Sequence, residues 1–250
     1  MSRNVEAYWS FRADREGRAV VLPDGRCDLI FRYNLEDDEP PVPIITGPAT
    51  EAYTIQYAAG ACWQGLRLRP DCGVWLWRDR IGEARDNVLR GEAAYGHLPR
   101  LREVGHRRAL TDGDPGLGRG IEGAAPDRRL CEAVALIHVS GGRMRLTALA
   151  GILGCSSRHL NRLFRDNVGM AAKTYAQLVQ FHRALALLRQ EHLPLTDVAL
   201  EAGYADHAHM TRAMRRFGRF APSDLPRDLV QPGTLTSYVR FVQELRPGAC

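Results

Sequence analysis

The sequence predicts an α+β protein in which a small β-rich amino-terminal domain precedes an all-α domain with two helix-turn-helix units. Two observations support this prediction. Short apolar runs broken by turn residues fill the first third of the chain, whereas residues 146–217 repeat one helical pattern twice. We expect the β-rich domain over residues 1–110, a linker over 111–126, the helical domain over 127–228 and a carboxy-terminal tail over 229–250.

The first domain contains five apolar runs that we expect to form strands. In residues 27–33 the odd-numbered positions are apolar, as in a half-buried strand, and Pro23-Asp24-Gly25 supplies the turn before it. The other four runs are residues 20–22, 43–46, 53–57 and 62–68. From Cys72 onward the pattern is helical and includes Val88 and Leu89. The sequence therefore predicts a small β-rich domain with helices after it.

Residues 111–126 are rich in glycine and proline, which predicts a flexible linker. Within them, Gly118, Gly120 and Gly123 match the letters of the dinucleotide-binding fingerprint. That fingerprint needs a strand before it and a helix directly after it, whereas here no strand pattern precedes the glycines and Pro126 follows them. We therefore expect a linker and no nucleotide site.

Residues 146–217 hold one helical pattern in two copies. Leu146-Thr147-Ala148-Leu149-Ala150 leads through Gly154 to His159-Leu160-Asn161-Arg162, and Leu195-Thr196-Asp197-Val198-Ala199 leads through Gly203 to His209-Met210-Thr211-Arg212. The offset is 49 residues at the glycines and 50 at the final arginines, so the second turn has one extra residue. A repeat whose two copies differ in length only by one residue in a turn predicts two helix-turn-helix units. Each unit would present one helix to the major groove of DNA.

Local signals support each helix of the repeat. Thr147 and Thr196 are expected to cap the first helix of each unit, and Ser157 and Asp206 the second. Small side chains at Ala150 and Ala199 would let the paired helices cross closely. Between the units, residues 173–190 have apolar positions three and four apart, which predicts one helix that fixes the distance between the units.

The positive charge lies in the half with the repeat. Residues 126–228 contain 15 Lys and Arg against 9 Asp and Glu, a net charge of +6. Residues 1–125 contain 17 against 19, a net charge of −2. Arginine-rich surfaces suit contacts to phosphate and guanine, so this distribution indicates a nucleic-acid partner.

Residues 127–228 resemble the DNA-binding domain of the AraC/XylS family of bacterial transcription regulators. The strings that carry the resemblance are 146–150, 156–164, Val168-Gly169 and 202–210, with Pro222 after them. Two positions depart from the family pattern: Ala172 stands where proline is usual, and Arg219 stands where glycine is usual, with Gly218 before it. The left-handed cap that glycine supplies at the end of the last recognition helix is therefore expected to shift.

The resemblance implies which side chains face DNA. Base-reading positions are Arg158, Asn161 and Arg162 in the first recognition helix and His207, Ala208, Thr211 and Arg212 in the second. Expected phosphate contacts are Arg165, Lys173, Arg215, Arg216 and Arg219. His209 aligns with His159 and is expected to be structural.

The first domain has a weaker resemblance to amino-terminal domains of AraC-type regulators, carried by the Pro23-Asp24-Gly25 turn and residues 66–70. It implies an effector or a second subunit as partner. Trp63, Trp75 and Trp77 are expected to fill the core, with an effector pocket as the alternative.

No pattern indicates a catalytic, cofactor or metal site. The six cysteines include no C-x-x-C pair, and no histidine precedes His97. Without an apolar run long enough to span a bilayer, we expect a cytoplasmic protein with reduced thiols and no membrane partner.

We therefore expect a sequence-specific transcription regulator whose partners are double-stranded DNA, RNA polymerase, a small-molecule effector and a second copy of the chain. One alternative is an enzyme of unknown chemistry in residues 1–110 with an autoregulatory DNA-binding domain. Another is a nucleoid-like protein that binds DNA without sequence preference, which the different base-facing residues of the two helices disfavour.

Overall fold

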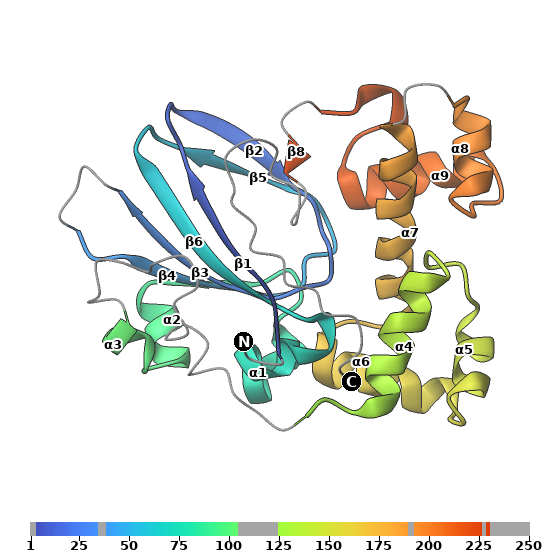
Figure 1. Cartoon of the computed structure of the whole chain (residues 1–250), viewed down its shortest axis with the longest axis horizontal. Coiled ribbons are helices and arrows are strands. Elements are labelled where there is room, and N and C mark those ends of the chain that lie inside the picture. Colours follow the sequence, from blue (N-terminus) through green and yellow to red (C-terminus); the bar gives the residue numbers. More distant parts are fainter. Residues whose placement is uncertain (1–3, 35–38, 105–124, 190–192, 227–228, 231–250) are drawn as a thin grey trace.

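The computed structural model describes residues 4–34, 39–104, 125–189, 193–226 and 229–230. A β-rich domain lies beside a helical domain, and the helix α7 runs along the boundary between them (Figure 1). The expected α+β fold class is confirmed. The expected linker, up to residue 124, and the tail beyond residue 230 lie outside the described residues.

The first domain contains two β-sheets and several short helices. Its strands are β1 (Val5–Arg12), β2 (Gly17–Val21), β3 (Asp28–Asn34), β4 (Val42–Thr46), β5 (Tyr53–Tyr57), β6 (Ala61–Leu68) and β7 (Val88–Arg90). Its helices are the 3-10 turns η1 (Pro70–Cys72) and η2 (Arg78–Glu83), and α1 (Gly73–Trp77), α2 (Glu92–His97) and α3 (Leu101–Val104). The five-stranded sheet has the order β1-β6-β3-β4-β7 with antiparallel neighbours. The three-stranded sheet has the order β5-β2-β8, where β8 is Leu229–Val230.

One face of the five-stranded sheet packs against the short helices. The alternating pattern of β3 and β6 puts Leu29, Phe31, Leu66 and Leu68 into a core whose members are at most 9% exposed. Trp77 is fully buried there, and its indole Nε1 donates to the carbonyl of Thr46 at 3.0 Å. The expected core role of Trp77 is confirmed, and Trp75 packs against the same core.

The other face carries polar and aromatic side chains. Arg67 of β6 pairs with Asp28 of β3 at 3.1 Å and with Asp24 at 3.2 Å. Trp63 packs with Phe11 and with Tyr57 of the second sheet, with ring centroids 5.3 and 5.9 Å apart. The half-buried Trp63 therefore lies in an aromatic contact between the two sheets.

The helical domain is built around α7. Its helices are α4 (Arg128–Val139), α5 (Leu146–Ile152), α6 (Ser157–Val168), α7 (Ala172–Leu188), α8 (Leu195–Glu201), α9 (His207–Ala213), the π-helical η4 (Met214–Gly218) and the 3-10 turn η5 (Pro222–Asp224). Tyr175, Leu178, Phe181 and Leu185 of α7 are at most 1% exposed. The helix predicted over 173–190 is thus confirmed, although it begins at Ala172 and ends at Leu188.

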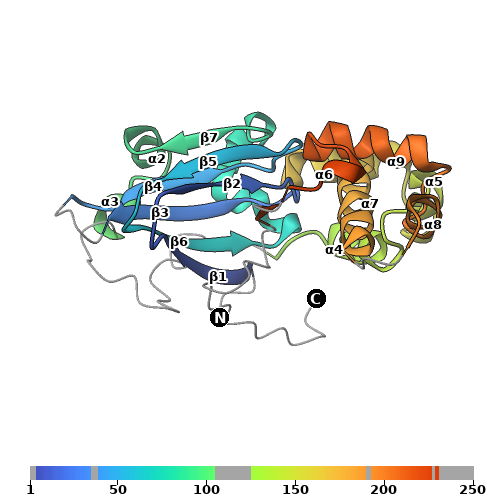
Figure 2. The same cartoon turned by 90° about the horizontal axis from the view of Figure 1, so that it is seen from above.

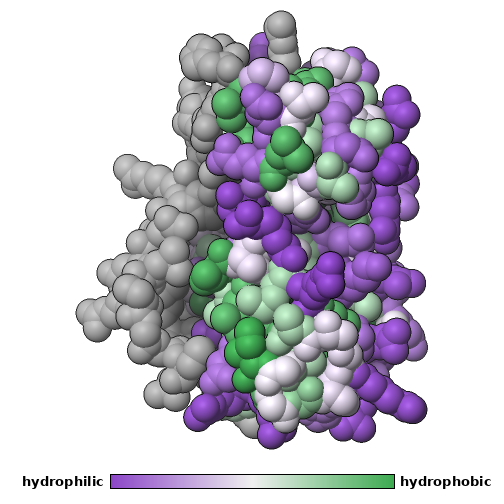
Figure 3. All heavy atoms as spheres, turned by 90° about the vertical axis from the view of Figure 1, so that its right-hand side faces the viewer, coloured by the Kyte–Doolittle hydropathy of each residue, from purple (hydrophilic) through white to green (hydrophobic). Residues whose placement is uncertain are grey.

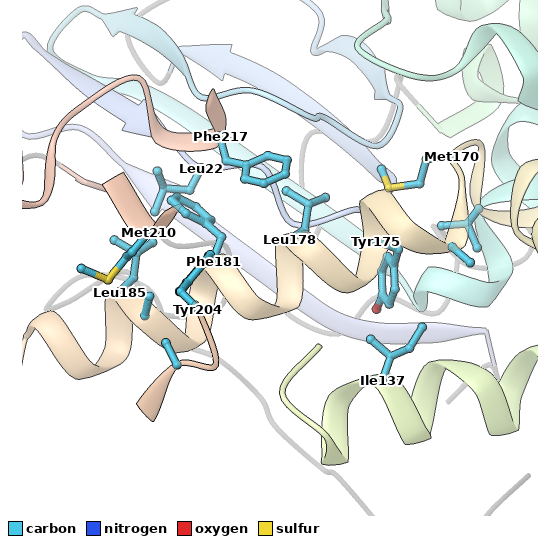
Figure 4. Close-up of a cluster of buried hydrophobic side chains, with 14 of the residues drawn as sticks. Leu22, Ile137, Met170, Tyr175, Leu178, Phe181, Leu185, Tyr204, Met210 and Phe217 are labelled. Atoms are coloured by element: carbon cyan, nitrogen blue, oxygen red, sulfur yellow. The ribbon is translucent and has the colours of Figure 1, made fainter. Parts of the chain in front are cut away.

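Two side chains of the first domain complete the core of the helical domain. Leu22 and Ala52 are 1% and 3% exposed and belong to the same buried cluster as Phe181 and Phe217 (Figure 4). After the last helix, β8 pairs in parallel with β2, Leu229 opposite Val20. The two domains therefore share a core as well as a chain connection.

Three features of the first domain differ from the sequence predictions. Strand β1 was not expected, although Val5, Ala7, Trp9 and Phe11 alternate as in a strand. Residues 88–90 form β7 instead of a helix, because they pair with β4 at the sheet edge. The run at 20–22 belongs to a strand that begins earlier, at Gly17.

Among the helices that the structure describes, none has the length and apolar composition needed to cross a membrane. Cys27, Cys62, Cys72 and Cys131 are buried free thiols, and Cys155 is a half-buried one.

Candidate nucleic-acid interface

The first helix-turn-helix unit consists of α5 and α6. Helix α5 begins at Leu146, and the amide of Leu149 bonds the carbonyl of Arg145 at 3.0 Å. Thr147 therefore lies inside the helix and does not cap it. The cap of α6 is Ser156, not Ser157, since the Ser156 hydroxyl accepts from the amide of His159 at 3.1 Å.

The second unit consists of α8, α9 and η4. Thr196 lies inside α8, where the carbonyl of Pro194 accepts the first helical bonds, so the expected Thr196 cap is also wrong. Asp206 does cap α9, since its carboxylate accepts from the amide of His209 at 2.6 Å. The signals for the second helices were therefore read correctly at Asp206 and one residue late at Ser157.

The turns confirm the extra residue in the second unit. The amide of Cys155 bonds the carbonyl of Ala150, and the amide of Tyr204 bonds that of Ala199, an offset of 49 residues. Cys155 is followed directly by the cap Ser156, whereas Ala205 separates Tyr204 from the cap Asp206. Ala205 is thus the additional residue.

The last recognition helix ends at the family position despite its substitution. Arg219 adopts the left-handed conformation, with φ of 62°, just as Gly169 does after α6, with φ of 79°. The expected shift of the cap to Gly218 was wrong. A Cβ at Gly218 would lie 2.6 Å from the ring of Phe220, so this glycine is explained by close packing.

Three arginines of the first recognition helix share one exposed face. Arg158, Arg162 and Arg165 are separated by four and three residues and all are exposed. Arg162 Nη2 lies 3.1 Å from Nδ1 of His159, so this histidine holds it. Asn161 is half-buried and donates through Nδ2 to the carbonyl of Ser157 at 3.1 Å. Because Nδ2 carries a second hydrogen, this bond does not by itself prevent Asn161 from donating to a base.

The second recognition helix presents one arginine among its base-facing residues, whereas the first presents two. Ala208 and Arg212 are exposed, and Thr211 is half-buried with its hydroxyl 3.4 Å from Nε2 of the exposed His207. His209 is exposed but packs edge-on against the buried Tyr204, with ring centroids 5.2 Å apart. This contact fits the structural role expected of His209.

The five expected phosphate contacts differ in their surroundings. Arg165, Lys173 and Arg215 are exposed, and within the described residues they take part in no ion pair. Arg216 is held by Gln177 Oε1 at 3.3 Å and lies over the ring of Phe217. Arg219 forms an ion pair with Glu51 of the first domain.

Helix α7 places the two recognition helices on one side of the molecule. Viewed from above, α6 and α9 lie along the same edge of the helical domain (Figure 2). Viewed from the side away from the first domain, hydrophilic side chains line the corresponding edge (Figure 3). One duplex running along this edge would meet both helices.

The first domain holds α7 through the turn at Pro23-Asp24-Gly25. Nε2 of His182 lies 2.7 Å from the carbonyl of Pro23, which can only accept, so this ring nitrogen carries a proton. Burial lowers the pKa of His182. Gly25 has φ of 72°, and a Cβ there would lie 2.9 Å from the ring of Tyr175. Sequence reasoning identified this turn but gave no sign of its contact with α7.

Comparisons with known proteins agree with this geometry. A family model described as a helix-turn-helix domain matches residues 149–228, and a model described as a domain of unknown function (DUF6597) matches residues 1–90. GlxA of Rhizobium meliloti, an HTH-type transcriptional regulator, is 33% identical over 81 residues, which are 32% of this chain and 25% of GlxA. RhaS of Escherichia coli, an HTH-type transcriptional activator, is 28% identical over 78 residues, or 31% of this chain and 28% of RhaS.

Residues 149–228 are therefore similar to the helix-turn-helix domain of AraC-type regulators. A crystal structure of an AraC-type transcriptional regulator from Chromobacterium violaceum is 26% identical and covers 38% of this chain and 87% of its own, with a TM-score of 0.36. The chain matches between about a quarter and a third of the lengths of GlxA and RhaS. The sequence matches to these relatives thus concern one part of this chain.

Proposed function

We propose that this protein is a sequence-specific DNA-binding transcription regulator. The observation that carries the proposal is the pair of recognition helices on one edge of the helical domain, each with exposed cationic side chains (Figure 2). Arginine can bond both acceptors of guanine, and asparagine can pair with adenine. Each helix would enter one major-groove segment, and the two segments would lie about one helical turn, roughly 34 Å, apart.

The base-reading and phosphate roles are part of the proposal. Arg158, Asn161 and Arg162 would read the first half-site, and His207, Ala208, Thr211 and Arg212 the second. Because Ala208 offers only a methyl group, the second helix would read less sequence than the first. Phosphate contacts would come from Arg165, Lys173, Arg215, Arg216 and Arg219.

Further partners are proposed on the same basis. Ile152 of α5 and Leu200 of α8 are each 62% exposed, and they lie on the helices that do not carry the base-facing residues. RNA polymerase is included as a partner because the resemblance to AraC-type regulators implies it, and these two exposed side chains are accessible to a protein partner. The first domain would bind a small-molecule effector or a second copy of the chain, and the protein would act in the cytoplasm.

The test is selection of a preferred duplex from a random pool by the full-length chain, followed by footprinting. We expect protection of two major-groove segments on one face of the DNA. A matched pair of variants separates sequence recognition from charge: Arg158→Ala should relax the preference at one base position, whereas Arg165→Ala should weaken binding to all duplexes alike. Binding without any sequence preference would favour a nucleoid-like protein and reject the proposal.

A further inference from the structure

The loop at residues 47–52, which we call the bridging loop, contacts the ends of both recognition helices. At one end Pro48 faces Gly169, the cap of α6, where a Cβ would lie 3.2 Å from Pro48 Cγ. At the other end the amide of Ala52 donates to the carbonyl of Phe217 at 2.7 Å. Glu51 forms the ion pair with Arg219, the cap of the second recognition helix. Six residues of the first domain thus touch both caps.

The bridging loop is fixed by the turn that precedes β7. The hydroxyl of Thr50 donates to Oδ2 of Asp86 at 2.7 Å, and the amide of Thr50 donates to Oδ1 at 2.5 Å. The amide of Asp86 in turn donates to the carbonyl of Pro48 at 3.2 Å. Gly47 passes so close to Ala84 that a Cβ would lie 1.7 Å from its carbonyl oxygen. These bonds hold the loop in one shape between two strands of the first domain.

The contacts reach only the carboxy-terminal ends of the recognition helices. Arg158 and Ala208, by contrast, lie in the first turns of their helices and are exposed. Each recognition helix also packs against α7, so a second point of contact at its carboxy-terminal end restricts how the helix can turn. The bridging loop provides this contact for both recognition helices within six residues.

We propose that the bridging loop determines which spacing between the two half-sites the protein accepts on DNA. Inserting one base pair moves the second half-site about 3.4 Å along the duplex and rotates it by about a tenth of a turn. Two helices joined through α7 alone can follow such a change by bending the connection. Helices whose caps are also held by one loop follow it only if the DNA deforms, which weakens binding. Asp86 and Thr50 are positioning residues in this device, since they act on DNA through the loop.

The experiment measures how the affinity for DNA depends on the number of base pairs between the half-sites, which we call the spacing profile. It rests on the proposed function because it uses the selected duplex. The full-length chain is titrated with the selected duplex and with duplexes carrying one base pair more or fewer between the half-sites. The variants are Asp86→Ala, which removes both bonds to Thr50, and the conservative Asp86→Asn. The control is Asp79→Ala, which removes an exposed carboxylate elsewhere in the first domain.

We expect the wild-type chain and the control to lose about tenfold or more in affinity when the spacing changes by one base pair. For Asp86→Ala the loss should shrink to about threefold or less, with the base preference within each half-site unchanged. Asp86→Asn should keep the wild-type profile because an amide oxygen can still accept from the Thr50 amide. A purely structural role would lower the unfolding temperature and all affinities together without changing this ratio.

Two outcomes overturn the inference while leaving the proposed function intact. One is a wild-type chain that binds all spacings equally, and the other is a folded Asp86→Ala variant with the wild-type profile. If Asp86→Ala does not fold, Thr50→Val removes only the hydroxyl bond and should flatten the profile in part; an unchanged profile would then refute the inference. A chain that selects no duplex at all removes the proposed function and the inference together.

Discussion

The two helix-turn-helix units follow the same plan but end differently. In the first, α6 is a regular helix that ends at Gly169, a residue suited to the left-handed cap. In the second, α9 widens into the π-helical η4 and ends at Arg219, which adopts the same conformation with a side chain. The second unit also places Phe217 against Leu22 of the first domain (Figure 4). Both ends contact the first domain, since Gly169 lies beside Pro48 and α6 packs against α1, η1 and η2. The second end differs because its left-handed residue is not a glycine, so we expect it to depend more on those contacts.

Leu22→Ala should have the largest effect on stability and should affect the second unit more than the first. Removing a fully buried leucine costs about 2–5 kcal/mol of unfolding free energy, measurable by urea denaturation. Because Leu22 packs with Phe181 and Phe217, amide hydrogen exchange should rise more in residues 210–217 than in 160–168. The control is Leu29→Ala, an equally buried leucine in the core of the first domain. Equal changes in exchange in both units would contradict the dependence of the second unit on the first domain.

Substitution of one arginine in each unit should change DNA binding in two different ways. Arg162→Ala should cost about 1–3 kcal/mol on the preferred duplex and relax the preference at one position of the first half-site. Arg215→Ala should weaken binding to all sequences and lower the slope of log affinity against log salt by about 1. Titrations at several salt concentrations on preferred and random duplexes measure both. If the two variants lost the same affinity on both duplexes, the base-reading role of Arg162 would be wrong.

The two helix caps should differ in how much substitution changes stability. Gly169→Ala places a side chain at φ of 79° and 3.2 Å from both the Ile81 carbonyl oxygen and Pro48, so we expect a loss of about 1–2 kcal/mol in stability. Arg219→Gly relieves the left-handed strain but gains chain entropy in the unfolded state and loses the exposed ion pair with Glu51. Its net effect should stay within about 1 kcal/mol. Thermal denaturation of both variants measures these stability changes. A loss of stability larger than about 1 kcal/mol for Arg219→Gly would show that the ion pair outweighs the relief of backbone strain.

Helix α7 between the units should make stability sensitive to acid. The pKa of His182 in the folded chain lies below the ordinary value of 6.5, so the unfolded chain binds its proton more tightly. The unfolding free energy should therefore fall as the pH decreases below about 6.5. The groups around His182 are Asp24, Arg26, Arg67 and His138.

His182→Gln should reduce this dependence on pH, because glutamine can still donate to the carbonyl of Pro23 but does not titrate. Unfolding measured between about pH 7 and pH 5 tests the expectation. A variant with the same slope as the wild-type chain would place the effect on another group.

Patterns within short stretches of the chain predicted much of the fold. The repeat located both units and the extra residue of the second turn, and residues 27–33 and 53–57 were recognised as strands because their features are local. The caps at Thr147 and Thr196 were wrong because each helix begins two residues earlier than a threonine cap implies. Val88 and Leu89 became a strand because of a distant pairing with β4, which a local pattern does not contain.

The candidate interface was predictable only in part. Its exposed arginines follow from helical spacing and from the resemblance. The sequence does not indicate that Asn161 bonds a carbonyl of its own helix. It also does not indicate the ion pair of Arg219 with Glu51, because these two residues come together only in the folded chain. The sequence also did not predict the contacts of Leu22 and Ala52 with the helical domain, because both residues have the pattern of ordinary strand ends.

Because Leu22 and Ala52 complete the helical domain, the two halves of this chain cannot be exchanged freely between regulators. A chimaera that joined the helical domain to an unrelated sensor would leave Phe181 and Phe217 facing a foreign surface or water. The recipient domain would need an aliphatic side chain at the place of Leu22 and a small one at the place of Ala52. In the evolution of such proteins, these four positions would have to change together, so that exchange of one domain alone would give poorly packed hybrids.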